Sequence, residues 1–392
     1  MDDHLGGRLS PTRLLQLNAF VSTLDRFAMP PMLIAMASDL GIPLSQVLQA
    51  AGAYFLAYGL MQPVWGVVSD SWGLVRTMRF TLFAAGLCTI ASAFVQAALM
   101  LSIGRGLAGG FFAAAYPASL IYLGDTVPAI RRQREVTQLM VGTALGTALA
   151  SWGAGLLAEV FTWRAAFVVT GVAALVLSVE LGRLPAPTRT RTHRSVLAPI
   201  AQALRTHAVA LVLLLAFVEG AVLLGVLTLL PASVEAAGAS AAVAGAVTGI
   251  YGLAVYVSAR GVGWLSGRLH PSWLIASGAS AALAACVTLS FSRSAASAAV
   301  VTLLLGLAWV AMHSSLQTWA IEILPGARAT VVSLFACSLF VGSAVAAVLV
   351  AGLAEEERYA DIFTLAAVTV VPLGVLATVG RLRWRAPAED VP

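Results

Sequence analysis

The chain has 392 residues, of which 59% are hydrophobic and only 10% are charged. Ordinary soluble domains carry about 25% charged residues, so this composition excludes a soluble globular protein and indicates a membrane protein. All 23 basic residues are arginines and the formal net charge is +5. The arginines are scattered over short polar segments and form no basic run interleaved with aromatic residues, so nucleic acid is not an expected partner.

Twelve apolar segments follow one another along the chain, and each is long enough to cross a bilayer as a helix of about 20 residues. Because helices satisfy their own backbone hydrogen bonds inside lipid, the sequence predicts an all-α integral membrane protein with twelve transmembrane helices. The expected spans cover residues 14–36, 47–67, 77–95, 98–124, 136–157, 163–181, 208–230, 241–258, 272–291, 298–320, 330–353 and 362–380.

The second half of the chain repeats the first at a constant offset of 197 residues (251 − 54 = 197), which aligns Tyr54 with Tyr251 and Gly66 with Gly263. Six spans return the chain to its starting side, so the two copies have the same orientation and are related by an axis along the membrane normal. We expect an N-terminal six-helix half over residues 1–182, a cytoplasmic Pro- and Arg-rich linker over 183–207, and a C-terminal six-helix half over 208–392.

The distribution of arginines predicts the orientation of the chain. With both termini in the cytoplasm, 18 arginines lie on the inner side and three on the outer side, as the positive-inside rule requires. The chain is therefore expected to be a multi-pass protein of a bacterial-type inner (plasma) membrane.

Several short motifs resemble those of the major facilitator superfamily, and within it the twelve-span proton-coupled drug and metabolite antiporters. The segment after span 2 is similar to the loop signature between spans 2 and 3, the segment with Arg105 is similar to the span 4 signature, and the glycines of span 5 resemble the antiporter signature. The resemblance implies the two-half major facilitator fold, transport by alternating access, a monomer, and a role of Arg105 in proton transfer. The matching residues are Gly66, Asp70, Gly73, Arg76, Arg105, Gly109, Gly142, Gly146, Gly153 and Gly155.

Ionisable side chains inside the spans are the candidates for proton coupling, because a charge at membrane depth costs about 2.5–3.5 kcal/mol on insertion scales. Asp25 lies near the middle of span 1 and could load and release a proton, or form a permanent ion pair with Arg105 or Arg26. Arg105 would then modulate this acid or only pair helices. Glu219 in span 7 is a second candidate, as a proton site, as a counter-charge for a cationic substrate, or as an acid neutralised by hydrogen bonding.

A second group of residues is expected to line the substrate cavity. Arg26 points about 100° away from Asp25 around its helix, so it pairs with another helix or lies beside the cavity. Aromatic and polar side chains on spans 2, 4, 8 and 10 would suit an amphipathic substrate, although each could also serve ordinary packing. These residues are Tyr54, Tyr58, Tyr116, Tyr251, Trp309, His313 and Gln317.

The segment from Gly66 to Arg76 is expected to form a polar turn that acts as an inner-side latch. Asp125 and Glu322 occupy equivalent places at the ends of spans 4 and 10 and are expected to form gate salt bridges. The expected gating residues are Gly66, Asp70, Gly73, Arg76, Asp125, Arg131, Glu322 and Arg328.

No motif for an enzyme, a metal or a cofactor stands out. A glycine-rich stretch at residues 104–110 has no preceding strand and no Lys-Ser/Thr, so it is no nucleotide loop and coupling to an ion gradient is expected. The expected activity is proton-coupled efflux of a small amphipathic drug or metabolite, with the lipid bilayer, protons and the substrate as partners. The alternatives are proton-linked uptake of a small organic solute and, from another class, a non-transporting membrane scaffold or sensor.

Overall fold

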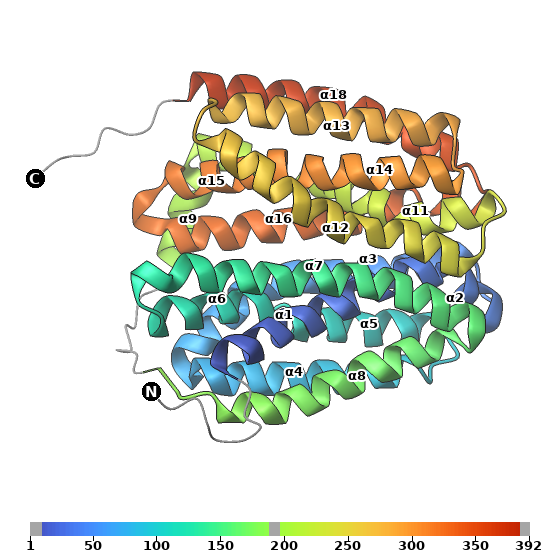
Figure 1. Cartoon of the computed structure of the whole chain (residues 1–392), viewed down its shortest axis with the longest axis horizontal. Coiled ribbons are helices and arrows are strands. Elements are labelled where there is room, and N and C mark those ends of the chain that lie inside the picture. Colours follow the sequence, from blue (N-terminus) through green and yellow to red (C-terminus); the bar gives the residue numbers. More distant parts are fainter. Residues whose placement is uncertain (1–9, 188–196, 385–392) are drawn as a thin grey trace, which may run out of the picture.

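The computed structural model describes residues 10–187 and 197–384. Within these residues every regular element is a helix, and the long helices run side by side in one bundle (Figure 1). The elements of the first half are α1 (Pro11–Ala28), the 3-10 turn η1 (Pro30–Met32), α2 (Leu33–Leu40), α3 (Leu44–Trp72), α4 (Leu74–Ser92), α5 (Ala98–Phe112), α6 (Ala115–Thr126), α7 (Ala129–Val160), α8 (Trp163–Glu180) and the 3-10 turn η2 (Leu181–Arg183).

The second half follows α9 (Leu197–Arg205), which lies in the predicted linker, of which residues 188–196 are outside the described residues. Its elements are α10 (His207–Glu219), the π-helical turn η3 (Gly220–Leu224), α11 (Gly225–Ala236), α12 (Ala241–Ser266), α13 (Pro271–Phe291), α14 (Ala295–Ala308), the π-helical turn η4 (Trp309–His313), α15 (Ser314–Ile323), the 3-10 turn η5 (Pro325–Ala327), α16 (Arg328–Leu349), α17 (Ala351–Glu355) and α18 (Tyr359–Arg383).

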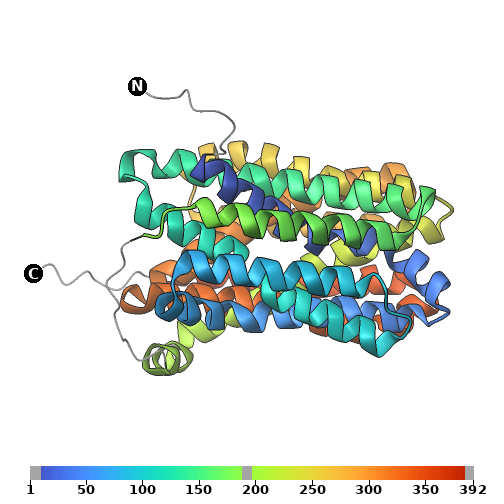
Figure 2. The same cartoon turned by 90° about the horizontal axis from the view of Figure 1, so that it is seen from below.

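The two ends of the bundle are distinct. The linker end, on the left in Figure 1, contains α9, the α3–α4 connection and the end of α18. The far end, on the right, contains α2 and the connection between α7 and α8. Figure 2 shows the same helices from below, again running between these two ends. In the described part of the chain, ten helical segments are long and apolar enough to cross a membrane. The segment α1–α2 and the helix α3 are not among these ten, but they lie in the same bundle.

The internal repeat is visible in the bounds of the helices. The fourth crossing segment begins at Ala98 and ends at Thr126, and its counterpart begins at Ala295 and ends at Ile323, each 197 residues later (295 − 98 = 197; 323 − 126 = 197). Both segments are interrupted near their middle, by residues 113–114 in the first half and by η4 in the second. The offset of 197 residues found in the sequence therefore also aligns the helix interruptions of the two halves.

The structure corrects the expected extent of two elements. Span 1 is split, because Pro30 has no backbone N–H for a helical hydrogen bond and the chain forms η1 before α2 begins. The polar turn expected over residues 66–76 is reduced to Gly73, whose φ of 102° is in the glycine-favouring region. Helix α3 runs on through Trp72, and the Ser69 hydroxyl donates to the Gly66 carbonyl oxygen at 2.8 Å, as a helical serine commonly does.

Close contacts of small residues hold the helices together, as is usual where lipid removes the hydrophobic drive for association. At the crossing of η3 and α16, a Cβ on Gly220 would lie 1.8 Å from the Leu339 carbonyl oxygen, and one on Gly342 would lie 1.9 Å from the Phe217 carbonyl oxygen. The crossing is reciprocal, and only glycine fits at either position.

Replacing these glycines is expected to destabilise the bundle. Gly220→Ala and Gly342→Ala should each lower the stability of the purified protein in detergent by about 1–3 kcal/mol, the usual cost of overpacking, seen as a lower thermal midpoint. Gly153→Ala is the matched control, because a Cβ there meets nothing within 4 Å and alanine is the better helix former. An unchanged thermal midpoint for both Gly220→Ala and Gly342→Ala would contradict the close crossing of η3 and α16.

Candidate functional site

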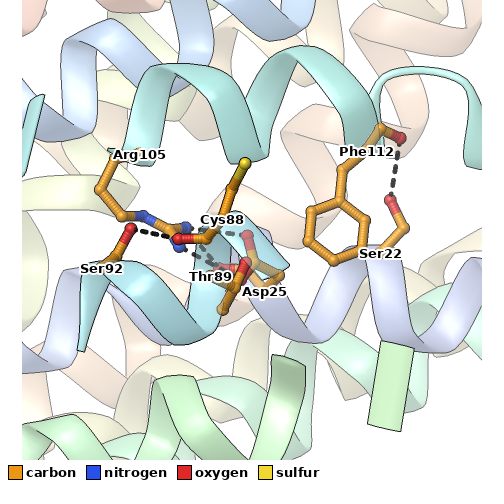
Figure 3. A network of polar contacts seen from close by, with 7 residues as sticks. All are labelled: Ser22, Asp25, Cys88, Thr89, Ser92, Arg105 and Phe112. Carbon is orange, nitrogen blue, oxygen red and sulfur yellow. Dashed lines mark hydrogen bonds and ion pairs between the residues drawn. The ribbon is translucent and has the colours of Figure 1, made fainter. Parts of the chain in front are cut away.

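A buried ion pair joins α1 to α5. Arg105 Nη2 lies 2.8 Å from Asp25 Oδ2 and Nη1 lies 3.2 Å from Oδ1, so the guanidinium holds both carboxylate oxygens. The Thr89 hydroxyl on α4 donates to Asp25 Oδ1 at 2.9 Å (Figure 3). The side chains of Asp25 and Arg105 are 0% and 1% exposed. The structure therefore shows the pair that was one of the two sequence-based readings of Asp25.

Aromatic rings cover the guanidinium of Arg105. Its Cζ lies 4.7 Å from the centre of the Tyr54 ring and 4.5 Å from the centre of the Phe167 ring. Arg105 Nε and the Tyr54 hydroxyl are buried without a hydrogen-bond partner. Because the surroundings are apolar, the charge of Asp25 and the charge of Arg105 are compensated mainly by each other. The Arg105 Nε and the Tyr54 hydroxyl remain beside the pair as unused polar atoms.

Arg26, the next residue on α1, faces the boundary between the two halves. Its Cζ lies 5.1 Å from the centre of the Tyr58 ring on α3 and 5.7 Å from the centre of the Phe340 ring on α16. Its Nη2 donates to the Thr23 hydroxyl at 3.4 Å, and its Nε is buried without a partner. Arg26 is thus a half-buried cation held by rings and by a neutral hydroxyl.

A second acid, Glu219, is paired in the C-terminal half. Glu219 is 0% exposed, and its Oε2 lies 3.2 Å from Nδ1 of His313. The His313 ring stacks on Trp309 with 4.0 Å between ring centres and also touches Phe335. The sequence placed Glu219 and His313 in separate groups, and the structure brings them together.

The remaining candidates for the cavity lie near these pairs. Tyr54 and Tyr58 stack on each other, with ring centres 6.0 Å apart, and Tyr251 contacts Phe27 at 6.4 Å. Tyr116 and Gln317 are half-buried. Aromatic side chains of both halves therefore flank Arg26, and rings of the second half flank His313, the partner of Glu219.

The gating candidates lie at the linker end. Asp70, Gly73 and Arg76 line a pocket of about 220 Å³ together with Ala186 and Pro187 of the segment after α8. Asp125, Arg131 and Arg328 are exposed. Glu322 was expected to form a gate salt bridge, and in this structure its Oε2 pairs with Arg381 Nη2 of α18 at 2.7 Å.

The contact between Glu322 and Arg381 lies within one half, whereas the sequence suggested a gate salt bridge across the halves. Arg381 is 7% exposed and its guanidinium also lies 4.8 Å from the Trp384 ring, so it is enclosed where the crossing helices α15 and α18 end. The sequence did not indicate a partner for Arg381, because this residue follows the last expected span and was expected to be one of the inner-side arginines.

Thr89 and Phe340 were also missed. A threonine or a phenylalanine in an apolar span carries no signal of its own, and only the packing of α4 and α16 reveals their contacts with Asp25 and Arg26. Among the described residues, no group of three or more His, Cys, Asp or Glu side chains could hold a metal ion.

At the far end, Asp39 in the last turn of α2 binds Arg164 and accepts a hydrogen bond from the Trp163 indole at 3.1 Å. The hydrogen bond from Arg164 holds the pKa of Asp39 below its usual range. This contact ties the first crossing segment to α8 within the N-terminal half.

Comparison with known proteins places the chain in a family. The family model of the Major Facilitator Superfamily matches residues 15–347. The chain belongs to this superfamily. It is therefore a multi-pass membrane transporter, and the all-α major facilitator fold predicted from the sequence is confirmed.

Curated relatives are similar over part of their length. The 4-hydroxybenzoate transporter PcaK of Pseudomonas aeruginosa is 29% identical over 301 residues, which cover 66% of each chain. The hexuronate transporter of Escherichia coli is 27% identical over 164 residues, 42% of this chain and 38% of the relative. The chain thus matches about two thirds or less of the length of these relatives.

Solved structures share the fold of the whole chain. The nucleoside transporter NupG superposes with a TM-score of 0.77 at 12% identity, covering 96% of this chain and 100% of that one. A D-xylose-proton symporter superposes with a TM-score of 0.74 at 15% identity, covering 96% and 97%. At these identities the likeness concerns the fold alone.

The Asp25–Arg105 pair makes a testable prediction about stability. Asp25→Asn and Arg105→Gln should each destabilise the protein by about 3–5 kcal/mol, because each leaves one buried charge uncompensated. The double variant should recover part of this loss, since it removes both charges. Thermal unfolding of the four proteins in detergent measures the coupling, and strictly additive effects would contradict an energetic pairing.

Proposed function

We propose that this protein is a secondary transporter that carries a small organic anion together with protons across the membrane by alternating access. The relatives suggest the class of substrate, because 4-hydroxybenzoate and hexuronate are both carboxylates at neutral pH. The proposal favours the uptake alternative over drug efflux, since the names of these relatives give organic acids as cargo. The same names leave little reason for a scaffold or sensor role.

The observation that carries this proposal is the set of groups that surround Arg26. A half-buried guanidinium without a carboxylate partner is costly inside a membrane protein unless it has a function. Arg26 uses a neutral hydroxyl and three aromatic rings instead, and it has an unused Nε. A planar guanidinium binds a carboxylate through two parallel hydrogen bonds, so Arg26 is suited to anchor an anionic substrate.

The surroundings of Arg26 fit an aromatic or sugar-like acid. Tyr58 belongs to the first half and Phe340 to the second, so a substrate held at Arg26 would touch both halves. Rings on both sides can stack on the body of a planar acid. Tyr54, Tyr116, Tyr251, Trp309 and Gln317 are the further side chains that we place around the substrate.

Asp25, Arg105 and Glu219 are the residues that we assign to proton coupling. Asp25 is held as an ion pair by Arg105 in this structure, so protonation of Asp25 requires that the pair opens. The unused Arg105 Nε and Tyr54 hydroxyl offer sites where water could enter when the helices move. Coupling would then link the opening of the pair to the change between the two states of the carrier.

The distribution of arginines along the chain suggests how the protein lies in the membrane. We propose that both termini face the cytoplasm of a bacterial-type cell, that the two halves divide at residues 183–207, and that the protein acts as a monomer. The linker end is then the inner side. Asp70, Arg76, Asp125, Arg131, Glu322 and Arg328 would exchange contacts there as the halves move, with Gly66 and Gly73 shaping the α3–α4 connection.

Substrate binding tests this proposal through Arg26. The purified protein should bind 4-hydroxybenzoate or a hexuronate, and Arg26→Gln should weaken binding at least about tenfold, since a buried charge contact of this kind is worth about 2 kcal/mol or more. Arg26→Lys keeps the charge and should retain part of the affinity. Binding is measured by calorimetry in detergent.

Transport is the second measurement. In proteoliposomes, an inward proton gradient should drive accumulation of the bound acid by the original protein. Binding of cationic drugs but of no organic acid, or full affinity of Arg26→Gln, would overturn the proposal. Asp70→Asn serves as a matched control, because this exposed acid at the linker end should leave binding unchanged.

A further inference from the structure

The contact between Glu219 and His313 has features that packing alone does not explain. Glu219 Oε1 is buried without a hydrogen-bond partner, while Oε2 faces Nδ1 of His313. Glu219 directly precedes η3 and His313 is the last residue of η4, and these are the π-helical turns of the described residues. Such turns are rare and often occur at functional sites.

The charged and titratable groups around Glu219 connect it to Arg26. His313 faces it from η4, and Tyr251 on α12 interacts electrostatically with both Glu219 and Arg26. Tyr251 also contacts Phe27, whose ring lies 5.3 Å from the Arg26 guanidinium. The acid and the cation therefore both lie beside Tyr251, in a water-poor interior where Coulomb interactions are strong.

We propose that Glu219 takes up the proton that travels with the substrate, which rests on the proposed function of Arg26. In the empty site, the positive charge of Arg26 balances the carboxylate charge of Glu219. A carboxylate bound at Arg26 compensates that charge, so a proton from water then binds Glu219 more readily. The coupling is reciprocal, because a proton on Glu219 equally favours binding of the anion.

His313 allows the pair to remain hydrogen-bonded in both states. When Glu219 is ionised, Nδ1–H of His313 donates to the carboxylate. When Glu219 is protonated, its hydroxyl donates to Nδ1 of the other neutral tautomer, with the imidazole proton on Nε2. One proton enters with one anion, so the loaded and the empty site carry the same net charge.

Proton uptake during substrate binding tests this assignment. The purified protein is mixed with 4-hydroxybenzoate in weakly buffered detergent solution containing a pH dye. The original protein should take up about one proton per bound anion, and Glu219→Gln should bind the anion with no uptake. Glu322→Gln is the control, because this acid pairs with Arg381 and should leave uptake unchanged.

The outcomes separate this inference from the proposed function. Absence of any anion binding by the original protein overturns the proposed function. Anion binding with undiminished proton uptake in Glu219→Gln overturns only the role of Glu219. If Asp25→Asn also retains uptake, the proton of binding belongs to Glu219 and not to Asp25.

A second inference rests on a different observation, at the far end. Glu159 near the end of α7 accepts a hydrogen bond from the backbone N–H of Ala242 at 2.8 Å, in the first turn of α12. Glu355 at the end of α17 accepts one from the N–H of Ser45 at 2.8 Å, in the first turn of α3. Each carboxylate thus caps a helix of the opposite half.

The internal repeat relates the two capped positions, and the capping acids fall within one residue of the same offset. Ser45 and Ala242 are 197 residues apart (242 − 45 = 197), and Glu159 and Glu355 are 196 apart (355 − 159 = 196). A carboxylate at a helix N-terminus gains from the hydrogen bond and from the helix dipole. Both contacts reinforce surfaces where the halves already touch, as between Gly155 and Ala241 and between Gly52 and Ala344.

We infer that these reciprocal caps, Glu159 on α12 and Glu355 on α3, hold the far end of the transporter closed. Separation of the halves at this end breaks both at once. Since each cap is a carboxylate that accepts a backbone N–H at 2.8 Å, each should contribute similarly to the balance between the two states of the carrier. This assignment concerns the far end, whereas Asp70 and Arg76 lie at the linker end.

Spin-label distances measure this balance. Labels are placed at Phe161→Cys and Phe291→Cys, one on each half at the far end, after Cys88, Cys286 and Cys337 are changed to serine. Glu159→Ala and Glu355→Ala should each raise the long-distance population about fivefold, since a lost cap is worth about 1 kcal/mol. The double variant should exceed either single one.

The neighbouring acid Glu356 supplies the control, because it pairs with Arg358 within its own half. Glu356→Ala should leave the distances unchanged. Equal distance distributions in the original protein and in both cap variants would overturn the inference. An equal shift in Glu356→Ala would also overturn the inference, because the effect would then follow from the loss of any nearby negative charge and not from the loss of a cap.

Discussion

The ion pair between Asp25 and Arg105 is the interaction on which the first half depends. Hydrocarbon does not solvate charge, so each ionisable side chain inside the bundle needs a partner, a ring or water. Asp25 and Arg105 compensate each other, and Thr89 adds a hydrogen bond from a third helix. One buried charge therefore fixes the relative positions of α1, α4 and α5.

The same constraint separates two neighbouring residues into different roles. Asp25 and Arg26 follow each other on α1, and the turn of the helix sends them to different surroundings. Asp25 is fully paired inside the first half, whereas Arg26 lies among rings of both halves and keeps an unused Nε. Only the second arrangement leaves a charge available for a ligand that both halves can touch.

Much of the fold could be predicted because hydropathy, arginine distribution and the repeat all act over long stretches. Ten crossing segments and the offset of 197 residues reappear in the helix bounds of the described residues (295 − 98 = 197). Local backbone was less predictable. The split at Pro30 and the extension of α3 through Trp72 depend on which hydrogen bonds the neighbouring turns can make, and hydropathy does not report these.

The site was predictable in its residues more than in its pairs. Buried acids and arginines are rare enough to be noticed in the sequence, so Asp25, Arg105 and Glu219 were found. The pairing of Asp25 with Arg105 was among the expectations, but the contacts of Thr89 with Asp25 and of His313 with Glu219 were not, because Thr89 looks like any other threonine and His313 comes from a distant helix. Pairing is a property of the packed bundle, and an ungapped repeat aligns equivalent positions without showing which ones touch.

The repeat also separates what the two halves share from what they do not. At the far end each half caps a helix of the other through a carboxylate, at positions 45 and 242 that the repeat aligns. The buried charges are not equivalent: an arginine compensates Asp25 in the first half, and a histidine faces Glu219 in the second. An arginine stays charged at any physiological pH and can only donate hydrogen bonds, whereas the Nδ1 of a neutral histidine can donate or accept one. Within a repeated scaffold, Asp25 is thus held by a permanent charge that must move away before the acid can be protonated, whereas Glu219 is held only by a hydrogen bond, as the proposed proton uptake requires.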